Sequence, residues 1–281
     1  MTEQSEFRSA SFAGLAGDDV GRTDERPALV LLHGLTFDRR MWRPALTELE
    51  IIDPDRRAIA LDLPGHGDSP DSSSYSMDSL VQRVHDAVGA AHLDRPVIVG
   101  HSLSAGLASI YATRYPSSGV VSVEGTLRVG GFASLAQSLE PALRGPGFDQ
   151  VWAQITDNIF RLGEVSPEVR DFVLSTGHPR QAIVLGYWQE LFERTAAELD
   201  AWTLRGVATL AELGMPYVAL LGQDPSPEDL AWVHTNLPDA RTLAWPKSGH
   251  FPHLAHPHRF AELLAETGRW GTNRVMAQAT A

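Results

Sequence analysis

The sequence of 281 residues contains no cysteine, no run of basic residues and no long apolar segment. The absence of cysteine excludes disulfides, thiolate metal ligands and a cysteine nucleophile, and it is consistent with a reducing compartment. No segment approaches the roughly 18 apolar residues of a transmembrane helix. The polar start, residues 1–10, lacks the basic and apolar parts of a secretory signal. We therefore expect a cytoplasmic protein with no membrane partner.

The charge balance argues against nucleic acid as a partner. There are 23 Lys and Arg against 35 Asp and Glu, a net charge of −12 at pH 7, and such a surface repels a phosphate backbone. With 43% hydrophobic and 21% charged residues, the composition is that of an ordinary globular protein. At about 150 residues per domain, the length fits one large domain or a core with an inserted subdomain.

Short apolar segments alternate with helical patterns in the first half of the chain and again near its end. Such alternation is typical of an α/β protein with a mostly parallel sheet flanked by helices. The predicted strands are 28–32, 58–62, 97–100, 120–124, 217–221 and a short one at 242–244. The predicted helices between and after them are 41–49, 78–91, 207–213, 227–237 and 258–269.

The alternation stops after residue 124. Residues 127–205 predict several helices and no strand, with Trp and Phe scattered among them. We interpret 127–205 as an inserted helical cap, 1–126 and 206–281 as the two parts of one core domain, and the tail from Gly271 as frayed.

The strongest candidate for chemistry is the segment GHSLS, in which an apolar strand leads through Ser102 directly into a helix. A tight turn of this kind lifts a serine hydroxyl above the end of a sheet and requires small residues on either side, here Gly100 and Ser104. The second of these is usually glycine, so Ser104 is a departure. Ala105 and Gly106 are expected to keep the start of the helix close to the sheet. The tripeptide Gly-x-Ser by itself, here residues 100–102, also fits a serine that only caps a helix.

Three further motifs accompany this turn: HGLT at 33–36, DLPGHGDS at 62–69 and KSGHFPH at 247–253. With them the chain resembles the α/β-hydrolase family over nearly its whole length. The resemblance implies an eight-stranded, mostly parallel sheet under a cap, with Ser102 as nucleophile and His250 as general base. The turn at Gly34 would direct the backbone N–H of Leu35, together with that of Leu103, at a developing oxyanion.

The acid of the implied Ser-acid-His set has two candidates. Family members place it after the strand that follows the cap or at the end of the strand before the cap. Asp224 follows the later strand but is only two residues past Gly222, one fewer than is usual. Glu124 ends the earlier strand, at the carboxyl edge where parallel sheets assemble their sites. We favour Glu124 and keep Asp224 as the second choice.

A more specific resemblance is to the zearalenone lactonases, which open a macrocyclic resorcylate lactone. It is carried by the string HFPHLAHP after position 249, by Glu124 and by Trp188 late in the cap. The chain departs from those enzymes in having the ordinary HG at 33–34.

The remaining histidines have simpler explanations. His33, His66 and His101 are expected to pack and form hydrogen bonds in turns, and no metal site is expected because the histidines near the C-terminus lack a matching carboxylate or thiolate pattern. Trp188 is the candidate substrate-binding residue, with a place in the core of the cap as the alternative.

These patterns predict a serine hydrolase that needs no cofactor and cleaves an ester or lactone of an apolar or aromatic small molecule. The same fold also hosts cofactor-independent dioxygenases, C–C bond hydrolases and non-catalytic ligand receptors, which remain alternatives. The sequence leaves the oligomeric state open, including a homodimer.

Overall fold

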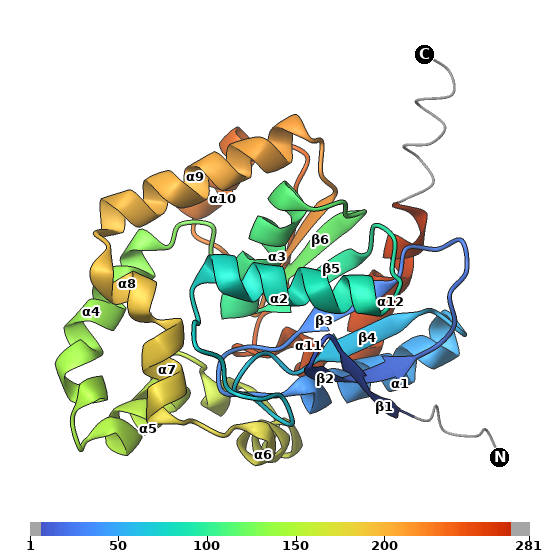
Figure 1. Cartoon of the computed structure of the whole chain (residues 1–281). Coiled ribbons are helices and arrows are strands. Elements are labelled where there is room, and N and C mark those ends of the chain that lie inside the picture. Colours follow the sequence, from blue (N-terminus) through green and yellow to red (C-terminus); the bar gives the residue numbers. More distant parts are fainter. Residues whose placement is uncertain (1–6, 271–281) are drawn as a thin grey trace.

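An eight-stranded sheet runs through the protein, with helices on both faces (Figure 1). The computed structural model describes residues 7–270, so the predicted fraying from Gly271 lies outside the described residues. The strand order is β1-β2-β4-β3-β5-β6-β7-β8; β2 pairs antiparallel with β1 and β4, and every other neighbouring pair is parallel. This confirms the predicted fold class.

The strands are β1 (Arg8–Phe12), β2 (Leu15–Val20), β3 (Leu29–Leu32), β4 (Ala58–Leu61), β5 (Val97–His101), β6 (Gly119–Val123), β7 (Tyr217–Leu221) and β8 (Arg241–Ala244). The α-helices are α1 (Arg43–Ile52), α2 (Met77–Ala90), α3 (Leu103–Arg114), α4 (Gly130–Arg144), α5 (Phe148–Asn158), α6 (Pro167–Thr176), α7 (Gln181–Tyr187), α8 (Gln189–Glu193), α9 (Ala196–Glu212), α10 (Pro227–Asn236), α11 (Pro252–Ala255) and α12 (Pro257–Glu266). Three 3₁₀ turns complete the described chain: η1 (Arg39–Trp42), η2 (Leu162–Glu164) and η3 (Thr267–Arg269).

Alternate residues of the central strands feed two separate hydrophobic clusters. In β3, Val30 and Leu32 face a cluster shared with α2 and α3, whereas Leu29 and Leu31 face one shared with α1 and α12. All four are fully buried. A strand covered on both faces reads as a continuous apolar run, which is why the central strands were predictable from sequence.

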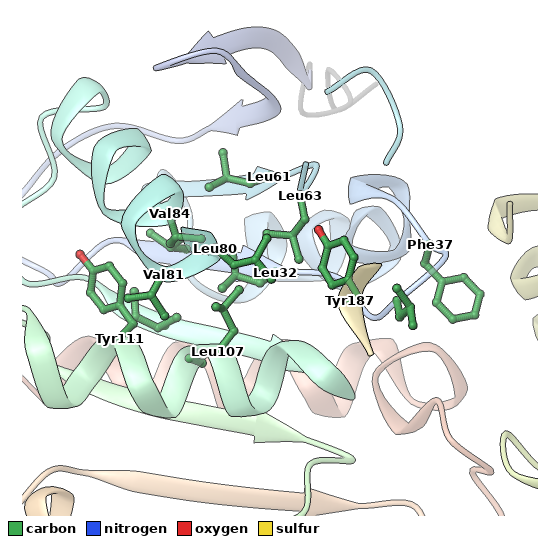
Figure 2. Packing of buried hydrophobic residues seen from close by; sticks show 14 of the residues in the cluster. Leu32, Phe37, Leu61, Leu63, Leu80, Val81, Val84, Leu107, Tyr111 and Tyr187 are labelled. Atoms are coloured by element: carbon green, nitrogen blue, oxygen red, sulfur yellow. The ribbon is translucent and has the colours of Figure 1, made fainter. Parts of the chain in front are cut away.

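The first cluster reaches the carboxyl edge of the sheet, where a helix from the 127–205 segment joins it (Figure 2). Tyr187, the last residue of α7, lies beside Leu63 and Leu32, and its hydroxyl donates to the carbonyl of Pro64 at 2.8 Å. The segment is thereby tied to the loop that follows β4.

Two strands were not located from the sequence. In β1 and β2 polar residues interrupt the apolar pattern, and Asp18 is fully buried in β2. Asp18 accepts hydrogen bonds from Arg39 at 2.9 Å and Arg43 at 2.7 Å, so its charge is paired inside the protein. A strand whose buried position holds a paired carboxylate does not show the expected alternation.

The helix predicted at 207–213 is the end of a much longer one. Helix α9 begins at Ala196 and is capped by Thr195, whose side chain accepts from the N–H of Glu198 while the Glu198 carboxylate accepts from that of Thr195. The boundary predicted between residues 205 and 206 therefore falls inside this helix. The helix predicted at 41–49 is divided into η1 and α1, with a proline in the first turn of α1.

Helices α4 to α9 separate β6 from β7 in the chain. Figure 1 shows α4, α5, α7 and α8 grouped at the left of the view, away from β1 and β2, with α6 at the bottom and α9 running past α3. No helix among residues 7–270 is long and apolar enough to cross a membrane.

Four buried histidines make stability depend on pH. Burial lowers the pKa of His33 to about 4 and that of His66 and His253 to about 3, and it holds the pKa of His101 well below 6.5. Between pH 6.5 and about 4 the unfolded chain binds protons that the folded protein does not. The stability that these neutral rings contribute is complete above pH 6.5 and is lost as the pH falls below it.

We expect the free energy of unfolding, measured by urea titration, to fall from pH 7.5 to pH 5, by at most about 1.4 kcal/mol per pH unit for each histidine. His66→Gln should reduce this slope, because His66 accepts the N–H of Thr36 at 3.0 Å only while its ring is neutral. His234→Gln, at an exposed position, is the control. An unchanged slope in His66→Gln would contradict the assignment.

Candidate active site

Ser102 stands at a tight turn between β5 and α3. Its backbone has φ 57° and ψ −123°, an uncommon conformation for a residue with a side chain. Gly100 is required there, because a Cβ at that position would lie 2.0 Å from the carbonyl oxygen of Ser104. The hydroxyl of the buried Ser104 donates to the carbonyl of His33 and so ties the turn to the end of β3. This hydrogen bond accounts for a serine where glycine is usual.

His250 links the serine to a carboxylate. Its Nε2 lies 2.8 Å from Ser102 Oγ, and its Nδ1 lies 2.9 Å from Glu124 Oε2. The His250 side chain is 11% exposed, and its ring stacks on Phe160 with centroids 5.1 Å apart and planes 5° apart. The backbone N–H of His250 also donates to the carbonyl of Phe160 at 3.0 Å. Phe160, which lies between α5 and η2, thus contacts both the ring and the backbone of His250.

Glu124 follows β6 directly and has φ 53°. One carboxylate oxygen faces His250, and the other accepts the N–H of Gly222. Burial raises the pKa of the Glu124 carboxyl, but the hydrogen bond and charge of His250, the N–H of Gly222 and the nearby Arg161 guanidinium outweigh burial and hold the pKa below its usual value. The carboxylate is therefore ionised at neutral pH and able to orient the imidazole.

Asp224, the second candidate for the acid, is exposed. The end of β7 instead supplies backbone to the site, since a Cβ on Gly222 would lie 1.9 Å from the carbonyl oxygen of Gly249. The structure brings Glu124, and not Asp224, to His250.

Arg161 is a site residue that sequence reasoning missed. It sits between α5 and η2 with φ 50°, and its Nη2 donates to Glu124 Oε2 at 3.2 Å and to the carbonyl of Gly249 at 2.9 Å. One guanidinium thus connects the acid to the loop that carries His250. Nothing in the local sequence distinguishes this arginine from the others between β6 and β7.

The histidines near the elbow support the site through packing. His101 Nε2 donates to the carbonyl of His250 at 2.8 Å. A Cβ on Gly34 would approach His101 Nδ1 to 2.8 Å, so this glycine allows the turn after β3 to lie against that ring. Within residues 7–270 no group of three His, Asp or Glu is placed to hold a metal ion.

Gly106 does not have the place expected from the sequence. Ala105 does lie close to the chain that follows β6, since a Cβ added to Gly125 would be 2.3 Å from the Cβ of Ala105. A Cβ added to Gly106, in contrast, would meet nothing within 4 Å. The expectation that Gly106 brings the helix close to the sheet is wrong, because this residue faces a cavity.

That cavity has a volume of about 380 Å³ and lies over Ser102 and His250. Both residues with candidate oxyanion N–H groups, Leu35 and Leu103, line it. Trp188 lines it as well, is 4% exposed and packs edge-on against Phe132 with centroids 5.4 Å apart. This tryptophan is therefore both a core residue and a wall of the cavity.

The model of the alpha/beta hydrolase family matches residues 29–263. The chain belongs to this family. The 2-succinyl-6-hydroxy-2,4-cyclohexadiene-1-carboxylate synthase of Serratia proteamaculans (strain 568) is 29% identical over 251 residues, which cover 85% of this chain and 92% of that protein.

Solved structures share the fold at lower identity. A thermophilic esterase from Thermogutta terrifontis has a TM-score of 0.63 and 17% identity, covering 92% of this chain and 97% of its own. The haloalkane dehalogenase DbeA-M1 loop variant from Bradyrhizobium elkanii has a TM-score of 0.69 and 18% identity, and the match covers 97% of this chain and 98% of the dehalogenase. At sequence identities this low, the similarity shows a shared fold and nothing about activity.

We expect Arg161→Ala to raise the pKa of Glu124, because it removes a cation that stabilises the carboxylate. The measurement is a ¹³C NMR titration of protein labelled at the glutamate carboxyls, with Glu124→Gln identifying the resonance. Arg180→Ala, which removes an exposed ion pair with Asp71, is the matched control. Equal titrations in the two variants would show that Arg161 does not act on Glu124.

Proposed function

We propose that the protein is a serine hydrolase that cleaves a carboxylic ester or lactone of an apolar or aromatic small molecule through an acyl-enzyme. The observation that carries the proposal is the continuous chain of contacts from Ser102 through His250 to Glu124, which opens into a mostly apolar cavity. Membership of the hydrolase family supports the same reaction type.

In the proposed mechanism, Ser102 Oγ attacks the carbonyl carbon while His250 Nε2 takes the hydroxyl proton. The C–O bond to the leaving alcohol breaks as His250 returns that proton to the alcohol oxygen. Water then attacks the acyl-enzyme with His250 again as base, which releases the acid and restores Ser102. Glu124 keeps the ring in the tautomer with the proton on Nδ1 and stabilises the imidazolium.

Two backbone N–H groups are proposed to stabilise the oxyanion, those of Leu35 and Leu103. Removing one such donor in other enzymes costs on the order of 100-fold to 1000-fold in rate. We also propose that residues 127–205 act as a cap, with Trp188 contacting the substrate. Apolar esters and resorcylate macrolactones such as zearalenone form the first substrate panel.

A second candidate function follows from the relative that matches most of the chain, which is named a synthase. The same serine and histidine would then serve a reaction other than hydrolysis. Reaction of Ser102 with an active-site reagent, without hydrolysis of any ester or lactone, would favour this candidate.

We expect a small fluorophosphonate to add one adduct to the wild-type protein, seen as an increase in intact mass, and none to Ser102→Ala. The physical reason is that His250 deprotonates the Ser102 hydroxyl as it attacks phosphorus. Circular dichroism of both proteins controls for folding. An adduct on Ser102→Ala would move the reactive group elsewhere.

We expect Glu124→Gln to lower kcat/KM for a hydrolysed ester by at least about 100-fold, because an amide can neither fix the correct imidazole tautomer nor stabilise its charge. Asp224→Asn is the matched control and should remain within about twofold. The reverse ranking would assign the acid to Asp224.

A further inference from the structure

The cavity extends far beyond the serine along one face of α3. The residues of α3 that line it share one face of the helix: Leu103, Gly106, Ser109, Ile110, Thr113 and Arg114. A helix of 12 residues is about 18 Å long, so the cavity follows α3 from the turn at Ser102 to the far end of the helix. The cavity volume is about 380 Å³.

Helix α9 packs beside α3 and also lines the cavity. Thr203, Gly206, Val207 and Leu210 line the cavity from this helix. The lining also includes polar side chains, among them Thr113 of α3 and Arg205 of α9. The result is an apolar groove between two helices with Ser102 at one end.

Two glycines in this groove, Gly106 and Gly206, are not required by the protein's own packing. Neither has a positive φ, and a Cβ on either would meet nothing within 4 Å. By contrast, a Cβ on Gly186 in α7 would lie 2.6 Å from the ring of Tyr75. Glycine inside a helix destabilises the helix by about 1 kcal/mol relative to alanine. At Gly106 and Gly206 no steric contact within the protein explains why this cost is present.

We propose that Gly106 and Gly206 determine substrate specificity by keeping the groove open for an extended hydrocarbon arm of the substrate. The substrate class is an ester in which one arm is an unbranched hydrocarbon chain that lies along α3. Cleavage of an ester that carries this arm rests on the proposed function. Binding of the arm in the groove does not depend on the proposed function.

The groove supports this assignment through its shape and its chemistry. Apolar side chains on both helices remove hydrocarbon from water, which favours binding by about 0.8 kcal/mol per methylene. A side chain added at either glycine would project into the space that the arm occupies. A single excess or missing methylene in an apolar pocket typically changes discrimination by 10-fold or more.

The test compares Gly206→Leu with Gly89→Leu, a matched control at an exposed position in α2, where an added Cβ also meets nothing within 4 Å. Binding is measured in a Ser102→Ala background, by tryptophan fluorescence, with p-nitrophenyl decanoate as the probe. We expect Gly206→Leu to raise the Kd about 10-fold and Gly89→Leu to change it less than twofold. Equal Kd values in the two variants would overturn the proposal.

A second readout uses active protein. The ratio of kcat/KM for p-nitrophenyl decanoate to that for p-nitrophenyl acetate should fall about 10-fold in Gly206→Leu and stay constant in Gly89→Leu. Should Gly206→Leu fail to fold, Gly106→Ala and Gly206→Ala replace it; both are expected to raise Tm, because they remove helical glycine, while still lowering the ratio.

The two readouts separate the inference from the proposed function. If Gly206→Leu binds p-nitrophenyl decanoate more weakly and the wild type hydrolyses no ester, the role of the groove in binding is supported and the proposed hydrolase activity is rejected. Hydrolysis with the same ratio in all variants would sustain the hydrolase and reject the groove.

Discussion

Parallel pairing of β3, β5, β6 and β7 brings the loops that follow these strands to one edge of the sheet, and the site depends on that arrangement. Ser102 follows β5, Glu124 follows β6 and Gly222 follows β7. Ser102 and His250 are 148 residues apart in sequence, yet they are joined by a single hydrogen bond. An antiparallel arrangement would send alternate strand ends to opposite edges and separate these groups.

The residues around His250 share an uncommon backbone conformation. Ser102, Glu124 and Arg161 all have φ between 50° and 57°, a region that residues with side chains rarely adopt. Such conformations persist where surrounding contacts enforce them. Close backbone approaches accompany them, at Gly100 beside Ser102 and at Gly249 beside Arg161. The side chains of Ser102 and Glu124 contact His250, and that of Arg161 contacts Glu124 and the carbonyl of Gly249.

The central strands and the elbow could be predicted because their signals are local. A buried parallel strand is a continuous apolar run, and a serine between a strand and a helix needs small neighbours. Strands β1 and β2 gave no such signal, since Asp18 occupies a buried position and is paired with Arg39 from a distant segment. The start of α9, with its capping residues Thr195 and Glu198, falls within 127–205, where several helices were predicted without bounds.

The sequence by itself determined the alternation of strands and helices and the turn that carries Ser102, because these depend on periodicity and turn chemistry within a few residues; His250 came from the resemblance to the α/β-hydrolase family. Only the tertiary structure decided which carboxylate lies against His250, that Arg161 joins it, and that Gly106 faces a cavity. Those outcomes depend on distances between segments far apart in the chain. Such distances are set by the packing of the whole protein, so no local pattern encodes them.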